Sequence, residues 1–306
     1  MDQAIAQEKE FDLRTAFYDE MFGNVDTNSE GLNEIETHIS KRISLLLRNN
    51  EKLSSLIPPL SKHLVELSEM LGDEMANFDE FGDILMKDIS LSTDVVRLAN
   101  SAAFRRTEEA VASTEAAIRV IGLRELSDLV SQALAKDAMK VSPIYFRMFG
   151  QQIWQHSLDC AVACRTIGSG YDSSETYFLG LVHDIGKIVI FSCLIDAFIE
   201  VNPDSEPGGK LFREMMTTYS LELSYQAAIE WDLPERMITA LKQQRFKPEE
   251  GLSLVLHHSN LCSEAFMLMS KRKISYEDGL KSLIQNGVNE EQAVSVLSIL
   301  KDMNKS

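Results

Sequence analysis

The sequence predicts an all-α fold, a multi-helix bundle preceded by an N-terminal helical extension. Apolar residues recur at spacings of three and four along most of the 306-residue chain, whereas the strict alternation of a half-buried strand is nowhere sustained. Capping residues and Pro/Gly interruptions separate these periodic stretches. With 44% hydrophobic and 25% charged residues, the composition is that of a globular protein with a buried core.

The first amphipathic stripe lies between Gly31 and Leu53, where apolar residues share one helical face at Leu32, Ile35, Ile39, Ile43, Leu46 and Leu47. The sequence Ile-Pro-Pro-Leu at 57–60 then interrupts the helix, because proline lacks a backbone donor and restricts the preceding residue. We therefore expect a helical extension over 1–52, a main domain over 53–270 and a closing helical pair over 271–306. If its apolar stripe is exposed, the extension is a candidate surface for homodimerisation or partner docking.

Further helices follow from capping and periodicity in the main domain. We expect helices over 61–71 and from about 81 to 89, a cap at 92–94 before a helix over 95–100, and Gly122 as a C-terminal cap before a helix over 125–139. The short connection at Gly122 resembles a helix-turn-helix, but the acidic balance and the lack of a clustered basic face favour simple helix packing.

The second half of the chain predicts more helices. A helix over 143–167 ends at Gly168-Ser169-Gly170, and a strongly apolar helix over 179–191 follows. The remaining expected helices span 212–219, 221–231, 234–242, 252–269, 276–286 and 290–303.

Charge and cysteine content bound the partners and the compartment. The formal net charge of −17 repels phosphate backbones and anionic membranes, so we expect protein or small-ligand partners and neither nucleic acid nor membrane. The four cysteines form no C-x-x-C pair, and Cys160 and Cys164 read as core residues, which favours a reducing cytoplasm. The polar, acidic N-terminus and the absence of a 20-residue apolar run predict a cytoplasmic, soluble protein.

The strongest chemical signal is the sequence Gly-Leu-Val-His-Asp-Ile-Gly-Lys at 180–187. Adjacent imidazole and carboxylate groups at His183 and Asp184 can bind one divalent ion when another helix supplies a further histidine. His156, in Trp-Gln-His-Ser at 154–157, is the natural candidate for that histidine.

Several segments in this order resemble the HDOD family, the signalling relatives of the HD phosphohydrolases. The resemblance rests on the proline-containing start at 57–60, Leu-Ala-Asn-Ser-Ala-Ala-Phe at 98–104, Ala-Ile-Arg-Val-Ile-Gly at 117–122, and the motifs at 154–157, 180–187 and 231–234 (Trp-Asp-Leu-Pro). It covers about 53–269 and implies an HD-like helical bundle in a bacterial signal-transduction setting.

The resemblance also implies a site. HD phosphohydrolases hold their ion with a histidine, a His-Asp pair and a distant aspartate; by position His156, His183 and Asp184 fill the first three places and Asn260 the fourth. An amide is a weaker, neutral ligand. We therefore expect no cofactor other than, at most, a single divalent ion. Some relatives carry further histidines where this chain has Glu222 and Gln-Gln-Arg at 243–245, which argues against a second metal.

Two alternatives remain open at the site. The cluster of His156, His183 and Asp184 either binds residual metal or persists as a buried hydrogen-bonded trio. Lys187, the candidate catalytic residue, either balances phosphate charge, as in active relatives, or pairs with a neighbouring carboxylate or a helix end.

The sequence thus favours a non-catalytic regulatory module with a degenerate HD metal site. We expect it to act by binding a signalling protein or a small phosphorylated ligand. The alternative is a phosphohydrolase that uses one divalent ion held by His156, His183 and Asp184, with water completing the coordination.

Overall fold

The computed structural model describes residues 12–22, 31–49, 57, 59–71, 78–105, 110–138, 144–190 and 210–304. The described residues contain helices and no strand, which confirms the predicted all-α class. The helices are α1 (Leu13–Phe22), α2 (Glu34–Leu46), α4 (Lys62–Leu71), α5 (Phe78–Leu85), α6 (Ile89–Ala99), α7 (Thr114–Ile121), α8 (Leu123–Ala138), α9 (Ile144–Ile167), α10 (Ser173–Val182), α12 (Lys210–Glu230), α13 (Glu235–Gln243), α14 (Gly251–Ser270), α15 (Tyr276–Gln285) and α16 (Glu290–Met303). A short helical segment also spans 185–190.

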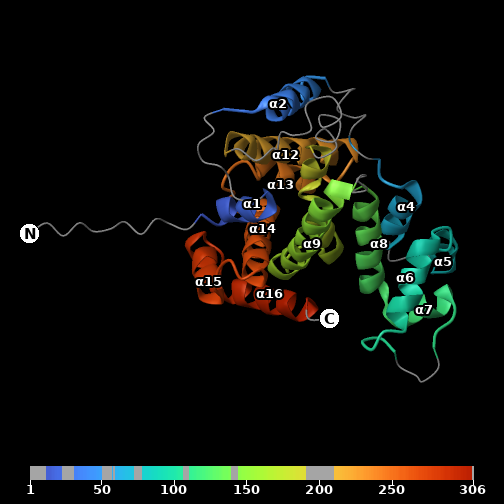
Figure 1. Ribbon diagram of the computed structural model, residues 1–306. Helices are drawn as coiled ribbons and strands as arrows, with labels where there is room; N and C mark the ends of the chain where they lie inside the picture. Colours follow the sequence, from blue (N-terminus) through green and yellow to red (C-terminus); the bar gives the residue numbers. More distant parts are fainter. Residues whose placement is uncertain are drawn as a thin grey trace, which may run out of the picture.

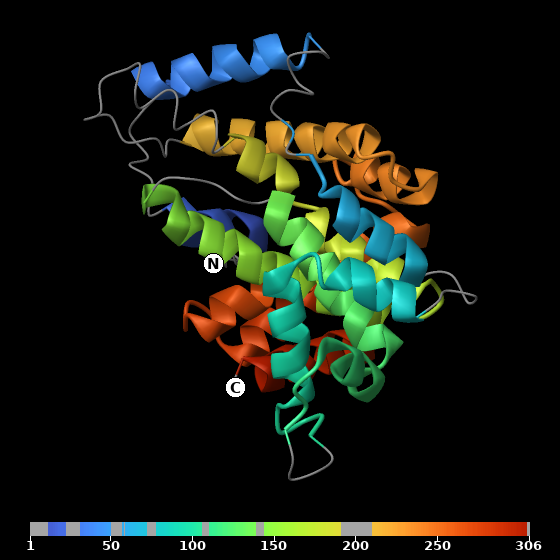
Figure 2. The ribbon, with the colours of Figure 1, turned by 90° about the vertical axis from the view of Figure 1, so that its right-hand side faces the viewer.

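The helices α9 and α14 form the centre of the bundle (Figure 1). The helix α9 packs against α10, α14 and α16, and α14 also contacts α1, α13 and α15. To one side, α10 meets α8, which together with α4, α5, α6 and α7 forms a second group around its own apolar cluster. The helices α2 and α12 lie side by side at the top of both views, with α2 outermost (Figures 1 and 2).

The apolar stripe of the N-terminal extension is buried inside this chain. In α2 the side chains of Ile35, Ile39 and Ile43 are buried in a cluster that includes apolar residues of α12. The hydroxyls of Ser44 and Tyr219 are 3.1 Å apart across the same contact. Because this stripe is used within the chain, it is not the exposed surface that would support partner docking, and homodimerisation through the extension stays a prediction.

Several predicted helix boundaries are wrong, two of them outside the 180–187 motif. The helix α6 begins at Ile89, because Asp88 caps it by accepting a hydrogen bond from the backbone N–H of Leu91 at 2.9 Å; the expected cap at 92–94 therefore lies inside the helix. The helix α12 is continuous over 210–230, where two helices separated near Ser220 were expected. Ser220 is buried and its hydroxyl donates back to the carbonyl of Thr217 at 3.0 Å, so this polar residue does not break the helix.

Other local predictions are confirmed. Gly122 is the C-cap of α7 with a φ of 91°, a left-handed conformation that favours glycine. The Asn100 side chain both donates to the carbonyl and accepts from the N–H of Val111, each at 2.8 Å, and so closes the connection between α6 and α7. This explains the asparagine of the Leu-Ala-Asn-Ser element.

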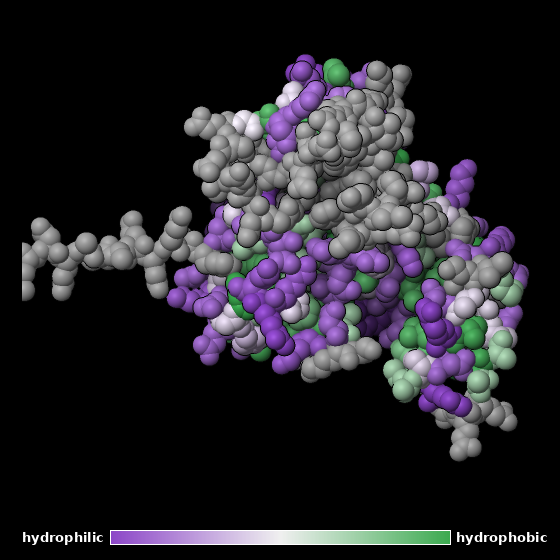
Figure 3. All heavy atoms as spheres, viewed as in Figure 1, coloured by the Kyte–Doolittle hydropathy of each residue, from purple (hydrophilic) through white to green (hydrophobic). Residues whose placement is uncertain are grey.

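Hydrophilic residues cover most of the described surface on the face drawn in Figure 3. Within the described part of the chain, no helix has the length and apolar character needed to cross a membrane.

Candidate metal centre

Two glycines of the 180–187 motif bring three helices into close contact. A Cβ atom at Gly180 would lie 2.5 Å from the Cα of Ala161, so α10 crosses α9 almost backbone to backbone. A Cβ atom at Gly186 would lie 2.0 Å from the carbonyl oxygen of Ser220 in α12. The N–H of Gly186 also donates to the hydroxyl of Ser224 at 3.0 Å. These close approaches place the residues between the two glycines at the junction of α9, α10 and α12.

His183 and Asp184 lie at a turn, not inside a helix as predicted. The helix α10 ends at Val182, and a second helical segment starts at 185. His156 comes from α9 and Asn260 from α14. Three of these side chains are buried, with exposures of 0% for His156, 5% for His183 and 4% for Asp184, and Asn260 is part-buried.

The four predicted ligand residues converge on one point. The Oδ1 atom of Asn260 lies 3.0 Å from Nε2 of His156 and 3.1 Å from Nε2 of His183. The Oδ2 atom of Asp184 lies 3.3 Å from Nε2 of His156 and 3.4 Å from Nε2 of His183. The structure therefore brings together His156, His183 and Asp184 as potential metal ligands, and adds the Asn260 oxygen to them.

Hydrogen-bond partners outside this centre define which atoms carry protons. The Nδ1 atom of His183 faces the carbonyl oxygen of Gly180 at 2.7 Å, and only an N–H can bond to a carbonyl. The Nδ1 atom of His156 lies 2.5 Å from the hydroxyl of Ser263, which in turn donates to the His156 carbonyl at 3.3 Å. The Gly180 carbonyl therefore assigns the ring proton of His183 to Nδ1, whereas the Ser263 hydroxyl can either accept from or donate to Nδ1 of His156.

The Nε2 atoms of both histidines face the centre. Burial lowers the pKa of His156 to about 4 and also lowers the pKa of His183, so both rings are neutral at pH 7. The side-chain amide of Asn260 donates to Glu264 at 3.1 Å, which turns its oxygen inward.

Four lone-pair atoms in van der Waals contact fit a bound cation. Ligands that each lie about 2.0–2.2 Å from one ion are about 3.0–3.5 Å from one another, which matches the separations here. The hydrogen-bonded trio considered from the sequence needs an imidazole N–H that points at Asp184. His183 directs its N–H at the Gly180 carbonyl, whereas Nε2 of His156 lies 3.3 Å from Oδ2 of Asp184 and can donate to it. The geometry fits both a bound cation and the trio.

Lys187 pairs with a carboxylate. Its ammonium group donates to Oδ2 of Asp184, the same oxygen that faces both histidines. Burial alone would raise the pKa of Asp184, but the nearby His183 and Lys187 hold it well below its usual value. Burial would likewise lower the pKa of Lys187, and the charge of Asp184 raises it instead. Of the two roles considered for Lys187, the structure shows the ion pair.

The sequence did not predict the residues that orient the ligands. Ser263 and Glu264 follow Asn260 by three and four positions, so they lie on the same face of α14 as Asn260. Both are buried, and Oε2 of Glu264 is without a hydrogen-bond partner. The sequence did contain a signal for them, because a serine and a glutamate stand on the otherwise apolar helix α14 and buried polar groups require hydrogen-bond partners.

The helix α1, which was also not predicted, covers the site. The Phe17 ring stacks on the ring of His156 with centroids 4.8 Å apart, and Phe17 is 1% exposed. The ammonium of Lys187 lies 5.4 Å from the Phe17 ring centroid and 5.3 Å from that of Tyr18. Arg14 lies near Glu264 and Asp184, whose negative charges raise the pKa of the guanidinium despite its burial.

The positions expected to lack a second metal are occupied by an ion pair. Glu222 in α12 and Arg245 after α13 contact each other. The guanidinium supplies a positive charge beside the carboxylate, and the absence of a second ion stays a prediction.

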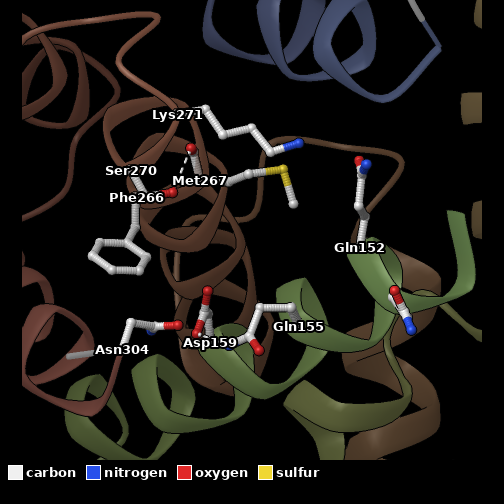
Figure 4. Close-up of a pocket in the computed structure, with 9 residues that line it drawn as sticks. Gln152, Gln155, Asp159, Phe266, Met267, Ser270, Lys271 and Asn304 are labelled. Atoms are coloured by element: carbon white, nitrogen blue, oxygen red, sulfur yellow. Dashed lines mark hydrogen bonds between the residues drawn. The ribbon is translucent and has the colours of Figure 1, made fainter. Parts of the chain in front are cut away.

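A cavity of about 260 Å³ lies further along α9 and α14, next to the end of α16 (Figure 4). Its lining includes Gln155, Asp159, Met267, Lys271 and Asn304, and none of the four converging ligand residues. Gln155 donates to Asp159 at 2.9 Å. Burial raises the pKa of Asp159 to about 6, against the opposing effect of its hydrogen bonds to Gln155 and Asn304.

The raised pKa of Asp159 predicts a pH-dependent stability. The folded protein holds a proton on Asp159 up to about pH 6, whereas the unfolded chain releases it near pH 4, so this stabilisation is complete below about pH 4 and disappears as the pH rises through 6. Between pH 4 and pH 7 we expect the free energy of unfolding of Asp159→Asn, relative to that of the parent, to rise by roughly 1–2 kcal/mol. The rise is smaller than the full pKa shift implies, because solvent in the open cavity screens part of the charge. Urea unfolding of both proteins at several pH values measures the difference, and a constant difference would contradict the assignment.

A family model of the HDOD domain matches residues 57–246, more than half of the chain. The chain belongs to the HDOD family. The matched span includes α4 to α13 with His156, His183 and Asp184, whereas α1, α2 and the Asn260-bearing α14 lie outside it.

Solved structures share this fold at low sequence identity. An HDOD domain protein of unknown function from Geobacter sulfurreducens is 18% identical, with a TM-score of 0.56, and the match covers 88% of this chain and 95% of that one. A candidate metal-dependent phosphohydrolase from Shewanella amazonensis SB2B is 15% identical, with a TM-score of 0.58 and coverages of 88% and 100%. A candidate signal transduction protein from Marinobacter aquaeolei VT8 is 15% identical, with a TM-score of 0.51 and coverages of 90% and 69%.

A relative in Treponema pallidum (strain Nichols), an uncharacterised protein, is 24% identical over 190 residues. The match covers 61% of this chain and 37% of that protein, so the aligned region spans little more than a third of the relative's length.

Proposed function

We propose that this HDOD protein is a non-catalytic signal-transduction module whose HD site holds one divalent ion as a buried structural centre. The observation that carries the proposal is the burial of His156, His183 and Asp184, which are at most 5% exposed, with Phe17 of α1 packed against His156; Asn260 is part-buried. Structural metal sites are closed by protein ligands, whereas catalytic sites keep a coordination position open to water and substrate.

The side chains around the ion site support the same role. Lys187, which could otherwise meet a phosphate, is neutralised by Asp184. Asn260 supplies a neutral oxygen where the HD phosphohydrolases use an aspartate. The ion itself would act as a Lewis acid where substrate can reach it, and here Phe17 occupies the space next to His156.

The ligands would be His156, His183, Asp184 and Asn260. Ser263 orients the first histidine, the carbonyl of Gly180 orients the second, and Glu264 orients the amide. Hydrogen bonds of this kind hold the ligand side chains in orientation before an ion binds. The module then acts through partners, for which the net charge of −17 favours proteins or small ligands over nucleic acid.

One observation favours a second function, a one-ion phosphohydrolase. Three protein ligands with nitrogen and carboxylate atoms, which His156, His183 and Asp184 provide, suffice for a catalytic ion when the fourth position is open. This function requires the site to open, because its substrate must reach the ion.

Metal analysis combined with a hydrolysis screen tests the proposal. We expect protein purified without chelator to hold about one divalent ion per chain, and His183→Ala to hold none, because the loss of a histidine ligand weakens metal binding strongly. His38→Ala, the same substitution on the remote helix α2, is expected to keep the ion. We expect no turnover of phosphodiesters or nucleotides by any of the three proteins.

Each contrary result has a defined meaning. Turnover that requires the ion and disappears in His183→Ala would make the chain a hydrolase and overturn the non-catalytic role. The absence of metal from the parent protein under metal-replete conditions would refute the structural centre.

A further inference from the structure

One face of helix α1 packs against the residues of the HD site. Leu13, Phe17, Tyr18 and Met21 lie on this face and are buried in the core clusters of the domain. The Phe17 ring contacts His156. The ring centroids of Phe17 and Tyr18 lie 5.4 and 5.3 Å from the Lys187 ammonium. The helix therefore contacts the metal-site residues themselves and not only the surrounding scaffold.

Charged residues also hold this helix in place. Glu20 lies 3.0 Å from the ammonium groups of both Lys271 and Lys273, which follow α14, and Asp19 pairs with Arg213 of α12. Arg14 faces the buried Glu264, one turn from Asn260. Opposite charges thus fix both ends of α1 against the helices that build the site.

The covering helix is not part of the HDOD domain as the family model defines it. The model begins at residue 57, whereas α1 ends at Phe22. Closure of the site consequently depends on a segment that precedes the domain in sequence and is separate from the helices that supply His156, His183 and Asp184.

We propose that α1 is an intramolecular plug of the HD site, and that its displacement is the conformational switch of the module. The proposal rests on the non-catalytic role proposed above and adds the element that regulates it. In the closed state Phe17 and Tyr18 cover His156 and Lys187; in the open state the same residues face solvent. A ten-residue helix held by one apolar face and a few ion pairs can leave without unfolding α9, α10 or α14.

The accessibility of the site histidines measures opening directly. We would treat chelator-treated full-length protein with diethyl pyrocarbonate and follow carbethoxylation of His156 and His183 by peptide mass spectrometry. Phe17→Ala is expected to accelerate their modification by about 100-fold, because the truncated side chain removes most of the apolar contact that keeps the plug seated.

A matched control separates opening of α1 from general destabilisation. Phe81 is also buried, at 3% exposure, but lies in the separate cluster around α5 to α8. Phe81→Ala should leave the modification rate within about twofold of the parent. If Phe17→Ala fails to fold, the double variant Asp19→Asn/Glu20→Gln preserves the core and should still accelerate modification by about three- to tenfold.

The outcomes distinguish the plug from the proposed function. Equal rates in the parent and the α1 variants, or equal acceleration in Phe81→Ala, would overturn the plug. Faster modification together with new turnover of bis(p-nitrophenyl) phosphate in the Phe17→Ala protein reloaded with Mn²⁺ would keep the plug and overturn the non-catalytic role. Faster modification without turnover would support both.

Discussion

Replacing Asn260 with aspartate should raise the affinity of the site for a divalent ion by about 10- to 100-fold. The amide oxygen already lies 3.0 and 3.1 Å from the two histidine nitrogens, so the substitution changes a neutral ligand into a charged one without moving it. Competition with a chromogenic chelator for Co²⁺ or Zn²⁺ measures the change.

A second substitution, at Glu264, extends this experiment. It accepts a hydrogen bond from the Asn260 amide, which an aspartate cannot donate. Glu264→Gln would supply an amide donor to the new carboxylate, so the double variant Asn260→Asp/Glu264→Gln should bind the ion more tightly than Asn260→Asp alone. Asn260→Ala should bind it more weakly than the parent. Equal affinity in the parent, Asn260→Asp and Asn260→Ala would show that residue 260 is not a ligand.

Gly186→Ala should lower the free energy of unfolding by about 3–5 kcal/mol or prevent folding. The added methyl group would lie 2.0 Å from the carbonyl oxygen of Ser220 and 2.8 Å from the backbone nitrogen of Ser224. Both contacts are with the backbone of α12, which cannot move aside by a side-chain rotation, so the 183–187 turn or the helix must shift.

Gly170→Ala is the control for this substitution. Nothing lies within 4 Å of a Cβ atom at Gly170, which follows α9 at the surface. Its free energy of unfolding in urea should remain within about 0.5 kcal/mol of the parent value. If Gly186→Ala is as stable as Gly170→Ala, the close approach of α12 is not a constraint on the motif.

Local sequence patterns determined the fold class and most helices of this protein. The three- and four-residue spacing of apolar side chains in α9, α14 and α16 follows from helix geometry alone. The motif at 180–187 with His156 indicated the family and predicted side chains that the structure brings together, because adjacent chemical groups are visible in a linear sequence. Asn260 lies beside them, as its position in the HD pattern predicted, and its role as a ligand stays a prediction.

Helix ends were less well determined by sequence. The 92–94 segment resembles a cap, but the backbone of α6 is already capped at Asp88. Ser220 resembled a break, but its hydroxyl bonds to the preceding turn of α12 and the helix continues. In both cases the outcome depends on which of several competing local hydrogen bonds the packed structure retains.

Only the tertiary structure decided that the site is closed. The contact of Phe17 with His156 joins residues 139 positions apart, and the contact of Glu20 with Lys271 joins residues even further apart. The helix α1 spans ten residues, so its apolar residues repeat over too few turns for their spacing to predict the helix by itself. A local pattern reports which side of a helix is apolar, whereas the surface that the helix covers is set by packing across the whole chain.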